Sequence, residues 1–198
     1  MEQASKSANS GLAGLVLAAG AAQRFGAAKQ LAQLDGLALV VRAVRALAPA
    51  CPAGVVVVTG AYQEEVARAL AGEPVRCVYN PGWRAGMGSS IGRGLDQLGA
   101  STSAALIALA DQPGIKTADF VALIDAWQQQ AEQPAAAAYE GHTGVPAIFP
   151  RSHWPALKQL QGDRGARSLL RGSVGVTAVE LPAAAWDVDE PGDLQGRG

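Results

Sequence analysis

Residues 14–29 read GLVLAAGAAQRFGAAK, an apolar run that passes into a loop rich in glycine and alanine. The run Gly14–Ala18 is short, aliphatic and not alternating, which predicts a strand covered on both faces. Small residues in the loop leave its backbone N–H groups accessible, and such amides bind phosphate oxygens without steric obstruction. Arg24 and Lys29 add positive charge. The segment therefore predicts a buried strand that leads into a binding loop for a triphosphate.

Three more apolar runs predict strands of the same sheet, at residues 54–59, 75–79 and 104–109. Between the runs lie segments with helical spacing, at residues 39–47, 64–70, 89–98 and 119–131. Strands that alternate with helices indicate βαβ units, with helices on both faces of a parallel sheet. The expected fold class is α/β.

The pattern changes after Gln133-Pro134. Residues 135–139 and 145–149 flank the segment Glu-Gly-His-Thr-Gly, which predicts a hairpin or a return strand and so a mixed sheet. Beyond it we expect helices near residues 152–160 and 166–170, a strand near 174–181 and a short helix over 190–194.

Composition predicts one domain over residues 11–198, preceded by a disordered N-terminus at residues 1–10. The 198 residues are 49% hydrophobic and 17% charged, which is enough apolar material for a buried core. A net charge of −1 offers no basic field for a nucleic-acid backbone, so no nucleic-acid partner is expected. Two cysteines fit a reducing cytosol better than a disulfide framework. Without an apolar segment long enough to span a bilayer, we expect a cytoplasmic protein with no membrane partner.

Polar or glycine-containing pairs follow the expected parallel strands, and in open parallel sheets ligands bind beyond the carboxyl ends of the strands. We therefore expect one ligand-binding rim made of Ala19-Gly20, Thr59-Gly60, Asn80-Pro81 and Asp111-Gln112. Asp111 brings a carboxylate to this rim, and Mg²⁺ prefers such oxygen ligands. An aspartate in this position can also cap the next helix, and this alternative stays open on the residues alone.

Five motifs carry a resemblance to a known family: Leu17-Ala-Ala-Gly-x-x-x-Arg-Phe-Gly-x-x-Lys29, Asn80-Pro-Gly-Trp-Arg-Ala-Gly-Met-Gly-Ser-Ser90, Ala110-Asp-Gln-Pro113, Gly162-Asp-Arg-Gly-Ala-Arg167 and Asp187-Val-Asp-Glu-Pro-Gly-Asp193. Over residues 12–195 the chain resembles the MobA-like NTP-transferase family, specifically its molybdenum cofactor cytidylyltransferase branch. One departure is Val145, which stands before Pro146 where the family usually has histidine, while His142 lies upstream.

The resemblance implies a three-layer α/β/α doubly wound fold, mostly parallel with one reversed strand, like that of the nucleotide-diphospho-sugar transferases. It implies catalytic roles for Lys29, Arg24 and Asp111, and a magnesium site at Asp111 and Asp189, with Asp187 as the nearby alternative to Asp189. The nucleotide-binding residues it implies are Leu17, Ala18, Ala19, Gly20, Arg24, Lys29, Thr59, Gly60, Asn80, Gly86 and Ser89. The acceptor-binding residues it implies are Ser90, Gln112, Pro146, Asp163, Gly165 and Arg167.

Plainer roles remain open for several of these residues. Ser89 and Ser90 also suit helix capping, and Asp163 with Arg167 would also make a surface ion pair. The chain's two histidines, His142 and His153, lie in loop-like contexts, and we expect neither to bind metal. Among the tryptophans, Trp83 alone lies in a candidate site loop.

The reaction that the resemblance implies is transfer of CMP from CTP to the terminal phosphate of the molybdenum-pterin cofactor, with Mg²⁺ and with release of pyrophosphate. The alternatives are a guanylyltransferase for the same pterin, a sugar-1-phosphate nucleotidyltransferase and, in a different class, a non-catalytic carrier of the finished cofactor. The wording Leu-Ala-Ala-Gly at residues 17–20 favours cytidine over the guanine branch. The expected partners are the small-molecule substrates and a molybdoenzyme or its maturation chaperone.

Overall fold

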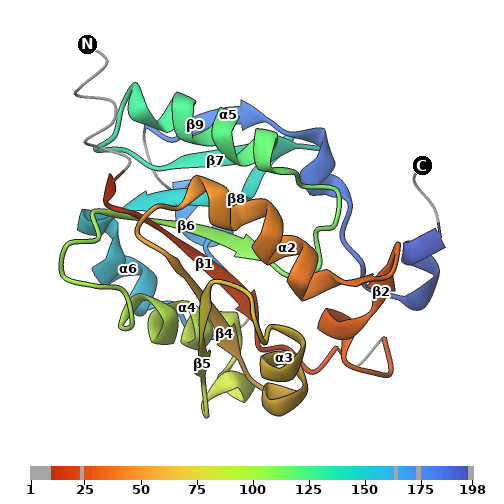
Figure 1. The fold of residues 1–198 in the computed structure, drawn as a ribbon. Helices are drawn as coiled ribbons and strands as arrows, with labels where there is room; N and C mark the ends of the chain where they lie inside the picture. The colour runs from red at the N-terminus through yellow and green to blue at the C-terminus, as the bar shows by residue number, and fades with distance from the viewer. Residues whose placement is uncertain (1–9, 23–24, 163–164, 173–174, 196–198) are drawn as a thin grey trace.

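A seven-stranded sheet forms the centre of the computed structural model, which describes residues 10–22, 25–162, 165–172 and 175–195 (Figure 1). The strand order is β5-β4-β1-β6-β8-β7-β9. The strands are β1 (Leu12–Ala18), β4 (Val55–Thr59), β5 (Val75–Tyr79), β6 (Ala104–Leu109), β7 (Ala135–Tyr139), β8 (His142–Pro150) and β9 (Thr177–Glu180). Strands β2 (Gln33–Leu34) and β3 (Leu37–Ala38) form a separate two-stranded hairpin.

One strand of the main sheet is reversed. Strand β1 pairs in parallel with β4 and β6, and β4 pairs in parallel with β5. Strand β8 is antiparallel to both β6 and β7, and β9 is parallel to β7. This arrangement confirms the predicted mostly parallel sheet with a single reversed strand.

Helices cover both faces of the sheet (Figure 1). The α-helices are α2 (Leu39–Leu47), α3 (Gln63–Ala69), α4 (Met87–Leu95), α5 (Thr117–Gln128), α6 (Trp154–Lys158) and α7 (Arg167–Gly172). The 3₁₀ helices are η1 (Lys29–Leu31), η2 (Ala48–Ala50), η3 (Trp83–Ala85), η4 (Arg151–His153), η5 (Pro182–Ala185) and η6 (Pro191–Gln195). Helices α2, α3 and α5 pack in one apolar cluster, and α4, α6 and α7 pack in the other.

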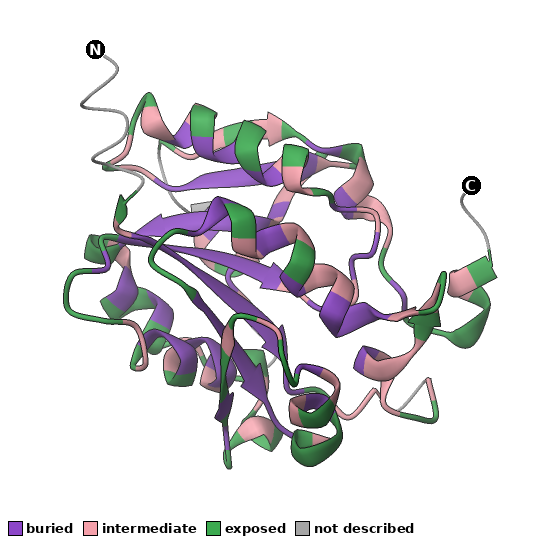
Figure 2. Ribbon diagram, viewed as in Figure 1, coloured by how far each residue is buried: buried purple, intermediate pink, exposed green. Residues whose placement is uncertain are grey.

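Strand β1 shows why the sequence lacks alternation. Its seven residues are all buried (Figure 2). Leu12 and Val16 belong to the cluster of α2 and α5, whereas Leu15 and Leu17 belong to the cluster of α4. Because both faces of the strand are covered, each position selects an apolar side chain.

The hairpin of β7 and β8 is tighter than its sequence suggests. Strand β8 begins at His142 rather than at Val145, because Glu140 and Gly141 form a two-residue turn with φ values of 50° and 75°. Positive φ at both positions matches the twist of the flanking strands. A register shift between Ala136 and Ala137 follows. Helix α6 and strand β9 are also shorter than expected, with five and four residues, and the expected C-terminal helix is the 3₁₀ helix η6.

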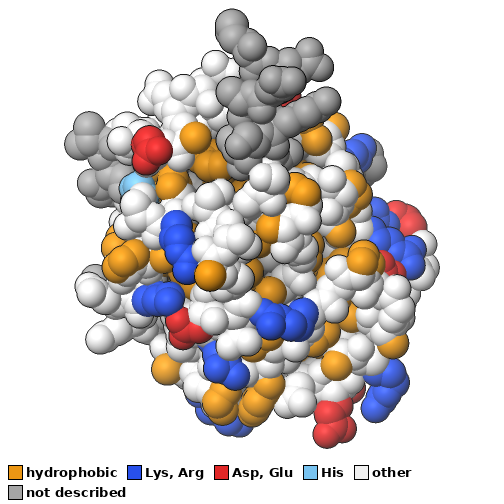
Figure 3. Space-filling model, turned by 60° about the vertical axis from the view of Figure 1, so that its left-hand side comes forward, with side chains coloured by type: hydrophobic (Ala, Val, Ile, Leu, Met, Phe, Trp, Pro, Cys, Tyr) orange, Lys and Arg blue, Asp and Glu red, His pale blue; other side chains and the backbone are white. Residues whose placement is uncertain are grey.

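Within residues 10–195, apart from the undescribed gaps, no helix combines the length and apolarity needed to cross a bilayer. On the face seen in Figure 3, Lys and Arg side chains are scattered, with hydrophobic and neutral atoms between them. Of the residues 1–10 that were predicted to be disordered, residues 1–9 lie outside the described part of the chain.

Two glycines of α4 give the fold a matched test. A Cβ at Gly88 would lie 2.4 Å from the backbone oxygen of Leu160, whereas a Cβ at Gly92 would meet Lys158 only at 3.8 Å. We expect Gly88→Ala to lower the free energy of unfolding by about 1–3 kcal/mol, because backbone cannot move aside as a side-chain tip can. We expect Gly92→Ala to raise it by about 0.5–1 kcal/mol through lower chain entropy. Urea unfolding of both variants measures the contrast, and equal effects would contradict this packing.

Candidate active site

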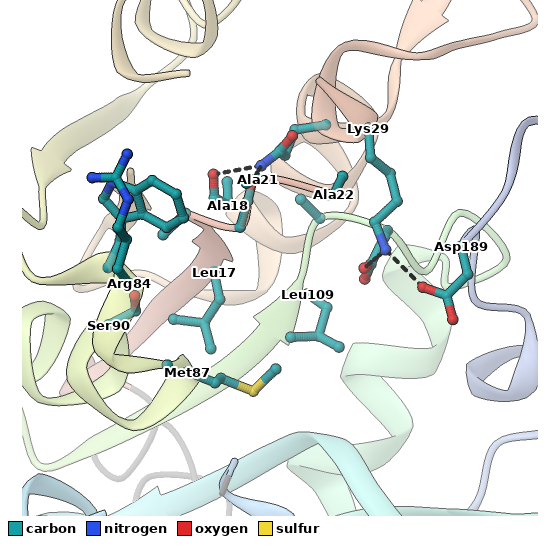
Figure 4. A pocket seen from close by; sticks show the side chains of 17 residues that line it. Leu17, Ala18, Ala21, Ala22, Lys29, Arg84, Met87, Ser90, Leu109 and Asp189 are labelled. Carbon is teal, nitrogen blue, oxygen red and sulfur yellow. Dashed lines mark hydrogen bonds and ion pairs between the residues drawn. The ribbon is translucent and has the colours of Figure 1, made fainter. Parts of the chain in front are cut away.

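A cavity of about 510 Å³ lies beyond the carboxyl ends of β1 and β6. Its lining includes nine of the residues predicted from sequence: Leu17, Ala18, Ala19, Gly20, Lys29, Gly86, Ser90, Asp111 and Asp189. In Figure 4, Lys29 and Asp189 lie at one end and Arg84 at the other, with the apolar side chains of Leu17, Leu109 and Met87 between them. The cavity thus has a charged end, an apolar middle and a second cationic end.

The loop after β1 is shaped by a buried amide. Gln30, 5% exposed, donates from Nε2 to the carbonyl oxygens of Ala18 at 3.0 Å and Gly20 at 2.6 Å. These bonds turn the two carbonyls toward Gln30. A Cβ at Gly20 would meet no described atom within 4 Å. The loop therefore borders open space on which a phosphate can approach its backbone.

Lys29 joins the two carboxylates predicted to bind metal. Its Nζ lies 2.7 Å from Asp111 Oδ2 and 3.0 Å from Asp189 Oδ1. Desolvation of the largely buried ammonium is the largest single influence on its pKa and lowers it. The charges and hydrogen bonds of Asp111 and then Asp189 outweigh that effect, so the pKa of Lys29 is raised overall. Lys29 therefore carries a full positive charge at neutral pH.

Backbone contacts hold the C-terminal segment against the rim. The N–H of Val188 donates to the carbonyl of Asp111 at 3.0 Å, which sets Asp189 opposite Asp111. The carboxylate of Asp193 accepts from the N–H groups of Asp189 and Glu190, both at 2.8 Å. Asp111 and Asp189, 78 positions apart in the chain, are thereby fixed side by side, which explains why the late Asp-Val-Asp motif belongs to this site.

Asp187 is a third carboxylate near the cluster. Although much of the residue is solvent-accessible, partial desolvation, and next the charges of Asp111 and Asp189, raise its pKa to about 6. Lys29 and the side chain of Gln112 act in the opposite direction. Three carboxylates around one ammonium make this end of the cavity a site that favours further positive charge.

The residues present fit a magnesium ion. Oδ1 of Asp111 is buried and has no hydrogen-bond partner among the described residues, so it is an oxygen ligand without a protein partner. No cluster of three or more Asp, Glu, His or Cys side chains with metal-binding geometry occurs within the described ranges. Mg²⁺ does not require one, since it is usually held by one or two carboxylates together with substrate phosphates and waters.

The predicted nucleotide-binding residues Thr59, Gly60 and Asn80, at the ends of β4 and β5, contact other parts of the protein. Asn80 is 4% exposed; its Nδ2 donates to the hydroxyls of Ser89 and Ser90 at 3.0 Å, and its Oδ1 accepts from the N–H of Gly82. Thr59 is buried, and a Cβ at Gly60 would lie 2.3 Å from the carbonyl oxygen of Ala19. Asn80 and Gly60 therefore position the loops on either side of the cavity. Thr59, Gly60, Asn80 and Ser89 do not line it, whereas Ser90, a predicted acceptor-binding residue, does.

Most of the predicted acceptor-binding residues likewise lie outside the cavity lining. Gln112, Pro146, Gly165 and Arg167 do not line the cavity. Gln112 is buried and donates to the carbonyl oxygens of Val145 and Ala184, while Val145 and Pro146 are joined by a cis peptide bond. The predicted residues Arg24 and Asp163 lie outside the described residues.

The lining residues outside the predicted set include three with long side chains, Gln30, Arg84 and Met87. The guanidinium of Arg84 stacks on the ring of Trp83 at 4.4 Å from its centroid, which is a cation–π contact. Arg84 and Met87 stand inside the quoted motif 80–90, so their position was a usable signal. No sequence signal marked Gln30, because a glutamine next to a lysine is common at protein surfaces. Its role is evident only from the hydrogen bonds that its amide donates to the loop.

Gln30 gives a direct test of how the loop is formed. We expect Gln30→Leu to raise KM for the nucleotide by roughly tenfold with a smaller change in kcat, because two hydrogen bonds of about 0.5–1.5 kcal/mol each are lost. The matched control is Gln33→Leu, since Gln33 is exposed on β2. Steady-state kinetics distinguish the two variants. Equal KM values in both would show that the amide does not shape the binding loop.

Comparison with known proteins agrees with this geometry. The family described as the MobA-like NTP transferase domain matches residues 14–179. A nicotine blue oxidoreductase from Paenarthrobacter nicotinovorans is 33% identical over 167 residues, which make up 80% of this chain and 80% of that protein. The solved homologue of Mycobacterium tuberculosis Rv0371c from Mycobacterium sp. strain JC1 has a TM-score of 0.79 at 28% identity over 94% of both chains. Molybdopterin-guanine dinucleotide biosynthesis protein A from Archaeoglobus fulgidus shares the fold, with a TM-score of 0.69 at 17% identity over 92% of this chain and 95% of that one.

Proposed function

The chain belongs to the MobA-like NTP transferase family, and on this premise we propose that it transfers CMP from CTP to the terminal phosphate of the molybdenum-pterin cofactor and releases pyrophosphate. The observation that carries the proposal is the ion-paired cluster of Lys29, Asp111 and Asp189 at the mouth of the loop after β1. Nucleotidyl transfer needs positioning and neutralisation of charge more than a proton-transfer residue. In this cluster the two carboxylates can position a cation and its phosphates, and the ammonium of Lys29 can neutralise negative charge.

The chemistry is an in-line displacement at the α-phosphorus. A phosphate oxygen of the acceptor forms the new P–O bond, while the bond between the α-phosphorus and the oxygen bridging to the β-phosphate breaks. The leaving pyrophosphate gains negative charge, which Lys29 and the amides of residues 18–22 are placed to offset. The acceptor phosphate is already ionised at neutral pH, so no residue is needed to remove a proton.

Asp111 and Asp189 would hold the magnesium ion, which when bound would neutralise and align the phosphates. Lys29 lies between these carboxylates, and its ammonium would be available to the phosphates if the carboxylates held a cation instead. Arg24 is proposed as a second phosphate contact. These assignments extend the sequence expectation, and the buried free oxygen of Asp111 supports them.

The wording Leu17-Ala-Ala-Gly20 supports cytidine, and GTP transfer to the same pterin is the alternative within the family. Sugar-1-phosphate transfer is the next. We further propose a molybdoenzyme or its maturation chaperone as the protein that receives the product, and the cytoplasm as the location.

Reductase activity is a second candidate, because the 33% identical relative is named an oxidoreductase. A cavity with a phosphate-binding loop also accommodates a nicotinamide dinucleotide in principle. Hydride transfer, however, gives no role to three carboxylates around a lysine. The transferase is therefore preferred, and absorbance of NADH or NADPH at its reduced band measures the rival directly.

The test is release of pyrophosphate by the purified chain with Mg²⁺, the molybdenum-pterin acceptor and each of CTP, GTP, UTP and ATP in turn. We expect release with CTP at a rate at least tenfold above that with GTP. Release with GTP alone would move the assignment to the guanine branch. Release with none, while the pterin still binds, would favour the non-catalytic carrier, and oxidation of NADH or NADPH with an added electron acceptor would favour the reductase.

A further inference from the structure

One aromatic side chain ends an otherwise alanine-only strand beside the carboxylate cluster. Strand β7 reads Ala-Ala-Ala-Ala-Tyr, and Tyr139 is its last residue. Because β8 is antiparallel to both β6 and β7, β7 runs in the direction of β6. Its carboxyl end therefore lies at the same rim of the sheet as Asp111, where ligands of such sheets bind.

The phenol head of Tyr139 is packed against backbone. A Cβ at buried Gly144 would lie 2.5 Å from Tyr139 Oη and 3.1 Å from Cζ, so only glycine leaves room for the hydroxyl. The ring also contacts the ring of His142 edge-on, with 4.6 Å between centroids. These contacts fix the direction in which the hydroxyl is presented.

Two of the predicted acceptor-binding residues, Gln112 and Arg167, act electrostatically on the hydroxyl. Partial burial, and next the charge of Asp187, raise the pKa of Tyr139, while the Arg167 guanidinium and the side-chain amide of Gln112 oppose this rise. The same Gln112 side chain interacts with Asp187. Tyr139 therefore keeps its proton at neutral pH and remains a hydrogen-bond donor.

Charge balance explains why a donor is needed here. Asp111 and Asp189 act electrostatically on Asp187, so without a bound cation an incoming phosphate dianion is repelled by three carboxylates unless it meets donors. Lys29 is already ion-paired with Asp111 and Asp189. Arg167 has a buried Nε without a hydrogen-bond partner in the described parts of the chain, and it acts on Tyr139. The guanidinium and the phenol O–H are therefore within electrostatic range of each other.

We propose that Tyr139 is an acceptor-binding residue whose hydroxyl donates to a phosphate-monoester group of the acceptor, next to the guanidinium of Arg167. The inference rests on the proposed function only in taking the acceptor to be a phosphate monoester. A hydroxyl held in one direction by Gly144 and His142 selects where the phosphate oxygens lie, and so which oxygen faces the α-phosphorus. Tyr139 thereby contributes to selection of the acceptor rather than of the nucleotide.

The test uses a fluorescent pterin that carries a phosphate monoester as the binding probe, titrated against the full chain without nucleotide. Tyr139→Phe removes only the hydroxyl, and we expect its Kd for the probe to rise about 10–100-fold, as for loss of a hydrogen bond to a charged group. The Kd for CTP should stay unchanged. The matched control is Tyr79→Phe, since Tyr79 is 42% exposed on the opposite edge strand β5.

A steric variant makes the test independent of the phenylalanine variant. We expect Gly144→Ala to raise the Kd for the probe in the wild-type background. The rise should be smaller in combination with Tyr139→Phe, because the closest contact of the new methyl group is with the hydroxyl. Circular dichroism checks that each variant is folded. Probe binding that is absent in the wild type, equal in wild type and Tyr139→Phe, or lost together with CTP binding would overturn the inference. Failure of the proposed function is distinct, since it shows as bound probe without release of pyrophosphate.

Discussion

Replacing Lys29 by alanine is expected to lower kcat by about 10²–10³-fold, the loss typical of removing one group that stabilises charge in a transition state. The ammonium lies 2.7 Å from Asp111 and is 14% exposed, so water would not replace it well. Without the ammonium, this residue no longer neutralises the negative charge that develops on the departing pyrophosphate. Measurement of pyrophosphate release under single-turnover conditions isolates the chemical step.

Lys158 supplies the control for this prediction. It also pairs with an aspartate, Asp96, but at the surface, where the side chains are 40% and 56% exposed. An exposed ion pair contributes about 0–1 kcal/mol to stability. Neither Lys158 nor Asp96 lines the cavity, so this pair adds no charge there. Lys158→Ala should leave kcat unchanged. If Lys29→Ala behaves like Lys158→Ala, the lysine has no part in the reaction.

Asp111→Asn is expected to be the second most damaging change, with kcat lowered by about 10²–10³-fold. The variant also tests metal binding: the concentration of Mg²⁺ that gives half-maximal rate should rise at least about tenfold, because even the partners that merely support metal ligands change affinity by that much. The amide keeps the shape of the side chain and removes its charge. A magnesium titration at saturating nucleotide measures both effects.

Asp96→Asn is the matched control, since Asp96 is a paired but exposed aspartate at the end of α4. Its magnesium dependence should equal that of the wild type. An Asp111→Asn variant with normal magnesium dependence would return Asp111 to the plainer role of a helix cap, the alternative that the sequence left open. A normal rate in the same variant would remove the carboxylate from the chemistry as well.

Much of the fold was predictable because burial on both faces leaves a simple signature. The run Ala104–Leu109 forms β6 over those same residues, and Leu39–Leu47 forms α2 as its spacing predicted. The hairpin was less predictable, because His142 and Thr143 are polar residues that pair with β7 through backbone groups. Their identities carry no strand signal, so the start of β8 was placed three residues late.

The candidate site was predictable where small residues and charges recur in a motif, and less so where packing decides. Lys29, Asp111 and Asp189 meet as expected, although 78 residues separate Asp111 from Asp189. Asn80 was predicted to contact nucleotide, yet its amide is used to hold Ser89 and Ser90. Gln30 and Tyr139 were missed because their roles depend on what their side chains touch, which spacing along the chain does not reveal.

The central claim is that the loop after β1 binds the triphosphate while Asp111 and Asp189 bind its divalent cation. A crystal structure with magnesium and a non-hydrolysable CTP analogue tests it most directly. The claim predicts phosphate oxygens beside Gly20 and Lys29, with the metal ion bound to Asp111. An analogue bound elsewhere, with all three of these residues remote from it, would contradict the claim.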